Sequence, residues 1–282
     1  MRHSFKNQIL QAFKSGYAIP AISVSNMETV LGALEAAHEK RSPIILQIAP
    51  IQMSNQGISH LEFTGLVELL AKRFSGLPYL VHLDHADTVD DCKAAIDAGF
   101  DSVMFDGSGL PFETNLTYTE AVRKYDGDIG LEAELGALNP EDGEGTVSTE
   151  ENTHFTDPRQ AKKMTDTLSL DALAISFGNA HGFYQGEPNL DFDLLNTIRK
   201  TTETPLVLHG GSGIGKDAIQ HAIKLGISKI NFFTQCDVAY RNAFCESSNK
   251  GQYMMVGEKA AKNAFKECVK TCIDVCMSGG RL

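Results

Sequence analysis

The chain has 282 residues, of which 42% are apolar and 22% are charged, as in an ordinary globular protein. These shares exclude a chain that is disordered throughout, and the 25 Gly and 9 Pro, which follow no period, exclude a collagen-like one. The formal net charge of −11 disfavours a general binder of nucleic acid or of an anionic membrane surface.

Neither a membrane span nor a secretion signal is expected from the apolar residues. No apolar run approaches the roughly 20 residues that cross a bilayer, and the first residues lack the apolar core of a signal peptide. We therefore expect a cytoplasmic protein whose six Cys are thiols. Cys268, Cys272 and Cys276 recur every four residues on one helix face, which indicates a packed face rather than the alternative, a thiolate metal site.

The chain alternates short apolar runs, rich in β-branched residues, with amphipathic stretches. The predicted strands cover Tyr17–Val24, Pro43–Ile48, Pro78–Leu83, Ser102–Phe105, Ile129–Leu135, Ala172–Phe177, Pro205–Leu208 and Lys229–Phe233. The predicted helices cover Glu28–Arg41, Leu61–Phe74, Val89–Ala98, Phe112–Tyr125, Pro158–Thr167, Phe192–Thr201, Lys216–Leu225, Gln235–Glu246 and Gly257–Met277. Continuous apolar runs of this length are typical of parallel strands that are buried on both faces.

Eight strand–helix units predict a closed (β/α)8 TIM barrel of the α/β class rather than an open doubly wound sheet. An open sheet would normally carry a glycine-rich phosphate loop after its first strand, whereas the residues after Val24 contain no glycine. We expect one domain over residues 1–282, with a C-terminal helical extension at about 257–277.

The polar residues of this chain gather at the predicted C-terminal ends of the strands, where the chemistry of such barrels is found. His85, His181 and His209 follow three different strands and can converge on one point. Three neutral imidazoles with an open fourth position make a catalytic zinc site. His82 lies further inside its strand, and we interpret it as a buried partner of that site.

A glycine-rich segment follows the seventh predicted strand. Residues Gly210 to Gly213 read Gly-Gly-Ser-Gly, a sequence that can expose successive backbone amides to a phosphate group. A tight turn into the next helix is the alternative. Asn231 and Thr234 at the end of the eighth strand favour phosphate binding, because they add hydrogen-bond donors at the same corner of the barrel.

Taken together, these motifs are specific. The chain resembles the class II, zinc-dependent ketose-bisphosphate aldolases, in particular the branch that contains the tagatose- and fructose-bisphosphate enzymes, over essentially its whole length. The resemblance rests on His82-Leu-Asp-His85, Asp106-Gly-Ser108, Glu132-Ala-Glu-Leu-Gly136, His181-Gly182, Leu208-His-Gly-Gly-Ser212 and Lys229-Ile-Asn231.

The resemblance implies roles for most of these residues. His85, His181 and His209 would be the zinc ligands, and Asp84 the acid/base next to the aldehyde carbon. The dihydroxyacetone phosphate half would be held by Gly182, Gly210, Gly211, Ser212, Asn231 and Thr234. The resemblance also places Asp106 and Glu134 near the metal. It implies a monovalent cation (Na⁺ or K⁺) beside the Gly182 and Gly210–Ser212 backbones. We further expect a homo-oligomer, either a dimer or a tetramer.

The sequence departs from the family pattern at the aldehyde end. Ser23 replaces the usual Asn, although Asn26 follows it, and Ala49 replaces a Ser or Thr near the second phosphate. Phe232 and Phe233 are read as packing at the barrel end or, alternatively, as a pocket wall.

The loop after the fifth strand, residues 139–144, is shorter than the corresponding loop of the family. A second base must act on the carbon acid, and we expect it on this loop, first at Glu141 and second at Asp142, because the shorter loop leaves the register open.

The predicted function is reversible cleavage of a ketose (bis)phosphate, of the fructose- or tagatose-1,6-bisphosphate type, to dihydroxyacetone phosphate and an aldehyde such as glyceraldehyde 3-phosphate. Three alternatives remain: a Schiff-base aldolase using Lys229, a metal-dependent sugar-phosphate isomerase or epimerase, and a non-catalytic sugar-phosphate-binding barrel. The Schiff-base mechanism would leave the three His unexplained, and a non-catalytic protein would not need Asp84.

Overall fold

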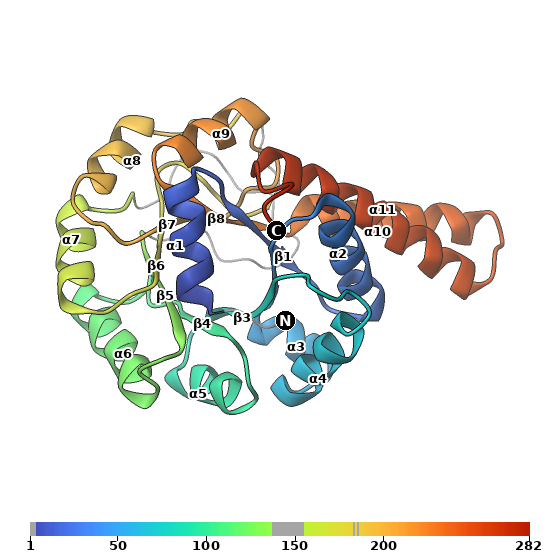
Figure 1. The fold of residues 1–282 in the computed structure, drawn as a ribbon, viewed down its shortest axis with the longest axis horizontal. Coiled ribbons are helices and arrows are strands. Elements are labelled where there is room, and N and C mark those ends of the chain that lie inside the picture. Colours follow the sequence, from blue (N-terminus) through green and yellow to red (C-terminus); the bar gives the residue numbers. More distant parts are fainter. Residues whose placement is uncertain (1–3, 137–154, 183, 185) are drawn as a thin grey trace.

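The protein is described by a computed structural model that covers residues 4–136, 155–182, 184 and 186–282. The strands are β1 (Ile19–Ser23), β2 (Ile44–Ile48), β3 (Tyr79–Ala86), β4 (Ser102–Phe105), β5 (Gly130–Leu135), β6 (Ala172–Ile175), β7 (Leu206–Leu208) and β8 (Ile227–Phe232). Each pairs with the next in parallel, and β1 pairs with β8, so the sheet closes (Figure 1). The predicted (β/α)8 barrel is confirmed.

The helices are α1 (Phe5–Ser15), α2 (Met27–Lys40), α3 (Pro50–Gln56), α4 (His60–Ala71), α5 (Val89–Asp97), α6 (Phe112–Tyr125), α7 (Pro158–Thr167), α8 (Phe192–Arg199), α9 (Lys216–Lys224), α10 (Thr234–Asn249) and α11 (Met254–Val275). The helices α1 and α3 were not predicted. For α3 the signal is weak, because it has seven residues and a single buried side chain, Met53.

The helix α1 closes the end of the barrel where the strands begin. Its buried residues Phe5, Ile9 and Ala12 pack with residues that point into the barrel, such as Ile45 and Leu80. In Figure 1 this helix crosses the middle of the ring of strands. Ligands therefore reach the barrel interior from the opposite end, where the strands finish.

One glycine is required for this closure. Gly130 begins β5, and a Cβ at this position would lie 2.5 Å from the Cβ of Phe5. The ring of Phe5 in turn stacks on the imidazole of His82, with ring centroids 5.7 Å apart. The bottom of the barrel is thus filled by side chains up to the level of His82.

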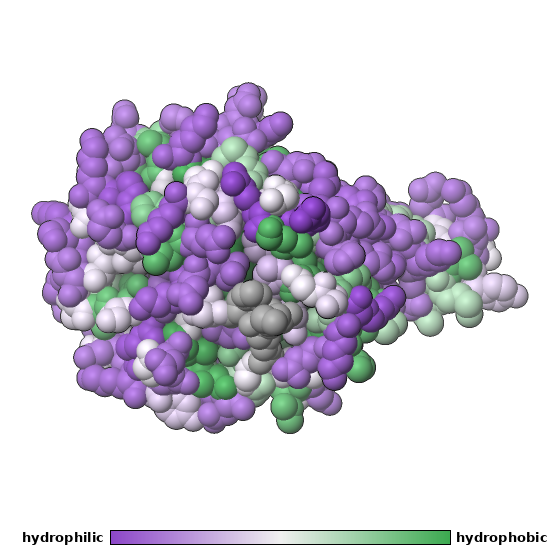
Figure 2. All heavy atoms as spheres, in the orientation of Figure 1, coloured by the Kyte–Doolittle hydropathy of each residue, from purple (hydrophilic) through white to green (hydrophobic). Residues whose placement is uncertain are grey.

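The last two helices form an arm that projects from the barrel on the right of Figure 1. At the tip of the arm, Tyr253 and the first two residues of α11, Met254 and Met255, are 83%, 69% and 71% exposed. Apolar atoms are visible along this arm in Figure 2. Among the helices that the structure describes, none has the length and apolar composition to cross a bilayer.

Candidate active site

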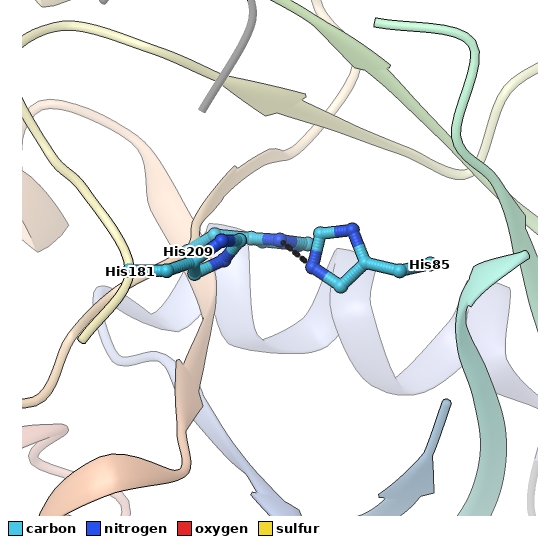
Figure 3. A group of neighbouring side chains, drawn as sticks. All are labelled: His85, His181 and His209. Atoms are coloured by element: carbon cyan, nitrogen blue, oxygen red, sulfur yellow. Dashed lines mark hydrogen bonds between the residues drawn. The ribbon is translucent and has the colours of Figure 1, made fainter. Parts of the chain in front are cut away.

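Three imidazoles meet above the C-terminal ends of the strands (Figure 3). His85 lies in β3, His181 follows β6, and His209 follows β7 directly. The Nε2 atom of His85 lies 2.9 Å from Nδ1 of His209, and each His offers one ligand atom within 4.8 Å of the others. The structure therefore brings together the three residues that the sequence singled out as metal ligands.

The backbone of β3 explains how two neighbouring residues reach one pocket. In a regular strand consecutive side chains point to opposite faces, yet Asp84 and His85 both line the pocket. The register between β3 and β4 shifts between Leu83 and Ala86, and His85 has a left-handed φ of 47°. Such a bulge re-aims side chains, and its strain is typical of functional sites.

In two of the imidazoles, a carboxylate contacts the ring nitrogen that points away from the other histidines. Nδ1 of His85 lies 2.8 Å from Oδ2 of Asp106, and Nε2 of His209 lies 3.0 Å from Oε1 of Glu132. The other carboxylate oxygen of Asp106 accepts hydrogen bonds from the backbone amide and the hydroxyl of Ser108. A carboxylate behind an imidazole sets its tautomer and strengthens it as a metal ligand.

The protonation of the imidazoles also suits a metal. Burial, followed by the charge on His85, lowers the pKa of His181 and His209 well below the usual value. Burial lowers the pKa of His85 as well, but Asp84, Asp106 and Glu134 outweigh it and raise that pKa well above normal. Two imidazoles are thus already neutral, which is the form that binds metal, whereas His85 has to release its proton when a metal binds.

Glu134 supplies a second possible metal position. Its Oε2 atom is buried and has no hydrogen-bond partner among the described residues, and it lies 3.7 Å from nitrogen atoms of both His85 and His209. Burial and the neighbouring Asp106 raise the pKa of Glu134 well above its usual value. His85, Asp106 and Glu134 form a second group of potential ligands, so the donor set fits a zinc ion.

Asp84 is held at the wall of the same pocket. Its Oδ2 accepts a 2.7 Å hydrogen bond from Nε2 of Gln47, and its Oδ1 accepts one of 3.1 Å from Nδ2 of Asn231. Gln47 Nε2 also donates to the hydroxyl of Ser23. Gln47 was not predicted as a site residue, although it is the single polar residue of an apolar strand that is buried on both faces.

The pocket spans about 370 Å³, including its open mouth. It is lined by residues from six of the predicted strand ends, and these are Ser23, Gln47, Ala49, Gln52, Asp84, His85, His181, Gly182, Gly210, Ser212, Asn231, Phe233 and Thr234. Of the two neighbouring aromatic residues, Phe233 lines the pocket, whereas Phe232 is buried in the core.

The glycine-rich loop after β7 packs closely against the loop after β6. Gly210 has a φ of 66°, and a Cβ there would lie 2.0 Å from the carbonyl oxygen of Ala180. The hydroxyl of Tyr184 joins the two loops, because it accepts from the Ala180 amide and donates to the Gly210 carbonyl oxygen. This hydroxyl stays protonated, since burial raises the pKa of Tyr184 to about 12.

Besides Asp106 and Glu134, which lie behind the imidazoles, the predicted site residues Asn26 and Gly211 do not line the pocket. The Asn26 side chain caps α2 by accepting a hydrogen bond from the Thr29 amide. Gly211 donates its amide to the Asn231 carbonyl oxygen. Glu141 and Asp142 lie outside the described residues.

The two remaining residues of interest lie below the pocket. His82 is fully buried, and its Nδ1 lies 2.7 Å from the Ser102 hydroxyl. Lys229 is also fully buried, with Nζ 3.0 Å and 3.1 Å from the two oxygens of Glu132. A lysine that is paired inside the barrel and does not line the pocket is poorly placed to form a Schiff base, so the geometry argues against that alternative.

The chain matches known aldolases in sequence and structure. The family model described as fructose-bisphosphate aldolase class-II matches residues 3–281. The YdjI aldolase from Escherichia coli K12 is similar with a TM-score of 0.88 and 31% identity, covering 100% of this chain and 99% of that one. A candidate fructose-1,6-bisphosphate aldolase from Coccidioides immitis has a TM-score of 0.86 and 28% identity, covering 98% and 96%.

A fructose-bisphosphate aldolase from Campylobacter jejuni shares the fold, with a TM-score of 0.82 and 22% identity over 100% of this chain and 97% of that one. The match of the family model to nearly every residue, together with the likeness to the Escherichia coli aldolase over the whole chain, decides the assignment. The chain belongs to the class II fructose-bisphosphate aldolase family and is an enzyme of the lyase class.

Proposed function

We propose that this enzyme is zinc-dependent and reversibly cleaves a ketose (bis)phosphate to dihydroxyacetone phosphate and an aldehyde. The observation that carries the proposal is the position of Asp84, whose carboxylate lies in the same pocket as three converging imidazoles. His85, His181 and His209 would hold the zinc ion. When bound, zinc supplies Lewis-acid stabilisation of the negative charge that develops on the ketose oxygens.

Asp84 is the proposed acid/base. In cleavage it would take the proton of the hydroxyl group next to the breaking carbon–carbon bond, and in condensation it would return that proton to the aldehyde oxygen. The hydrogen bonds from Gln47 and Asn231 hold the carboxylate in place. The proton on the carbon of dihydroxyacetone phosphate would be handled by Glu141 or, second, by Asp142.

The phosphate of the dihydroxyacetone half would bind at the corner made by the loops after β6 and β7 and the start of α10. Gly182, Gly210, Ser212, Asn231 and Thr234 line the pocket there, and Gly211 keeps the loop in place through its hydrogen bond to Asn231. Fixing a remote phosphate orients the reacting carbon atoms and so contributes to the rate. A Na⁺ or K⁺ ion beside the same backbones would add to the positive field.

Ala49, Gln52 and Phe233 line the pocket, whereas Ser54 does not. We assign Ala49 and Phe233 to the aldehyde end. Fructose 1,6-bisphosphate and tagatose 1,6-bisphosphate are the first substrates to test, followed by the corresponding 1-phosphates. Because all six cysteines are free thiols, as a reducing compartment favours, we expect the reaction to take place in the cytoplasm.

The exposed apolar residues at the tip of the arm support a homo-oligomer. Four consecutive apolar side chains are exposed there, namely Tyr253, Met254, Met255 and Val256. Contact with a second subunit would remove these side chains from water. Sedimentation at several protein concentrations, with Met254→Asp as a variant, tests whether the arm holds a dimer or a tetramer together.

The function is tested by adding each ketose phosphate to the purified enzyme and measuring the release of dihydroxyacetone phosphate. Release that is abolished by a chelator, restored by Zn²⁺ and unaffected by borohydride is the expected result. Interconversion of sugar phosphates without release of triose phosphate would instead indicate an isomerase or epimerase. Binding without any turnover would indicate a sugar-phosphate-binding protein.

A further inference from the structure

Three cysteine sulfur atoms converge at the start of the arm, at a place that the proposed aldolase reaction does not use. Cys236 lies in the first turn of α10, and Cys268 and Cys272 lie one turn apart on α11. The Sγ atom of Cys236 lies 3.4 Å from that of Cys268 and 3.9 Å from that of Cys272, and all three lie within 4.8 Å of one another.

The sequence alone pointed to a different set. Cys268, Cys272 and Cys276 share one face of α11, but Cys276 does not belong to the group. Its place is taken by Cys236, which comes from another helix. A stripe of small side chains on one helix is explained by packing alone. Here, by contrast, the sulfur atoms come from two helices and lie close to one point.

The spacing of the sulfur atoms suits a bound ion. Three sulfur ligands at about 2.3 Å from one ion in a plane are about 4.0 Å apart. The 3.4 Å and 3.9 Å separations are close to this value without any change of the fold. Cys236 and Cys272 are buried and Cys268 is partly exposed, so an ion can reach the sulfur atoms from the Cys268 side.

The side chain of Gln235 completes the site. Its Nε2 donates to Sγ of Cys272 at 3.0 Å and to Sγ of Cys268 at 3.7 Å. Amide donors directed at sulfur stabilise thiolates in metal sites.

We propose that Cys236, Cys268 and Cys272 form a binding site for a thiophilic metal ion of the monovalent copper class. Soft thiolate ligands favour Cu(I) and zinc. A structural zinc site almost always has four protein ligands, and no fourth histidine, cysteine or carboxylate belongs to this group among the described residues. Each cysteine that binds as a thiolate gives up its thiol proton to solvent, and no electron is transferred.

The site also touches the phosphate corner of the catalytic pocket. The backbone amide of Gln235 donates to the hydroxyl of Ser212, which lines that pocket. A metal ion between α10 and α11 would join the two helices of the arm where they leave the barrel. We therefore expect the ion to stabilise the arm, because a ligand that binds the folded state raises the melting temperature.

The experiment is a titration of the zinc-loaded enzyme with Cu(I) without oxygen, in competition with a coloured Cu(I) chelator. The wild-type chain should bind one Cu(I) with a rise in Tm, and Cys268→Ala should weaken binding at least about tenfold, the scale of a lost metal-site interaction. Cys276→Ala is the matched control, since it removes a buried thiol from the same helix face but should leave Cu(I) binding unchanged. The zinc content should be the same in all three proteins.

Cys236→Ala provides a second variant in case one of the others folds poorly. The proposal is overturned if Cys268→Ala and Cys276→Ala bind Cu(I) equally, or if the wild-type chain binds none. It is also overturned if mild peroxide converts Cys236 and Cys268 to a disulfide while Cu(I) fails to bind, because the thiols would then be a redox pair.

Discussion

Asp84 and His85 are consecutive in β3, yet both side chains line the same pocket, because the left-handed backbone at His85 turns its imidazole toward His209. The proposed acid/base and one proposed metal ligand are thereby placed next to each other, with Asp84 Oδ2 4.0 Å from His85 Nε2. Proton transfer and charge stabilisation can then act on adjacent atoms of one substrate.

The metal prediction concerns His209. We expect the purified enzyme to hold one catalytic Zn²⁺ per chain and His209→Ala to lose both zinc and activity, since three protein ligands hold such an ion. Metal analysis of the two proteins provides the measurement. His221→Ala, on α9, is the control and should retain zinc. Unchanged zinc in His209→Ala would show that the imidazoles are not its ligands.

The acid/base prediction separates chemistry from metal binding. Asp84→Ala should keep its zinc and lose turnover by about 10²–10⁴-fold, the usual contribution of a positioned acid/base. The kcat for the best ketose phosphate measures the loss. The exposed Asp87, three residues further on, offers the control, as Asp87→Ala should turn over normally. A loss below about tenfold would exclude the proposed role of Asp84.

A pH dependence follows from the raised pKa of His85. At pH 7 the imidazole of the metal-free enzyme carries a proton, which zinc must displace, because the ion binds neutral imidazole. Zinc binding should therefore release a proton, and zinc affinity should continue to rise above pH 6.5, the ordinary pKa of histidine, until the raised pKa is passed. Calorimetry in two buffers with different protonation enthalpies counts the protons.

Asp106→Asn is the matched variant for this measurement. Its loss of charge lowers the pKa of His85, so fewer protons should be released, and zinc affinity should fall about 10- to 100-fold through the lost partner of the imidazole. Equal proton release by the two proteins would mean that His85 is not the group that titrates.

The substrate prediction concerns the aldehyde end of the pocket. Ala49 cannot donate a hydrogen bond from its side chain, and a lost charge-assisted phosphate contact costs about 1.5–3 kcal/mol. We therefore expect a weaker preference for bisphosphates over the corresponding 1-phosphates than a second phosphate site would produce. The kcat/KM values for both ketose bisphosphates and both 1-phosphates test this. A bisphosphate preference above about a thousandfold, which corresponds to about 4 kcal/mol, would show that another residue completes the second phosphate site.

Ala49→Ser serves as the gain-of-function variant for this prediction. If the missing hydroxyl limits binding of the second phosphate, the variant should favour bisphosphates more strongly than the parent enzyme does. Ser54→Ala is the control, because Ser54 does not line the pocket.

The sequence by itself determined the barrel and the convergence of the three imidazoles. Parallel strands buried on both faces read as continuous apolar runs, and their C-terminal ends must meet at one end of a closed barrel. His85, His181 and His209 each follow such a run, so their approach required no further information. The first helix could have been found too, since Phe5, Ile9 and Ala12 recur at helical spacing.

Tertiary structure decided which other residues contact these site residues. Asn26 was expected at the substrate, but its side chain caps α2, and Gln47 instead contacts Asp84 from the adjacent strand. Likewise Cys236, rather than Cys276, joins Cys268 and Cys272. Sequence periodicity places residues on the faces of their own strand or helix, whereas contacts between elements depend on the register and packing of the closed barrel, which no local pattern encodes.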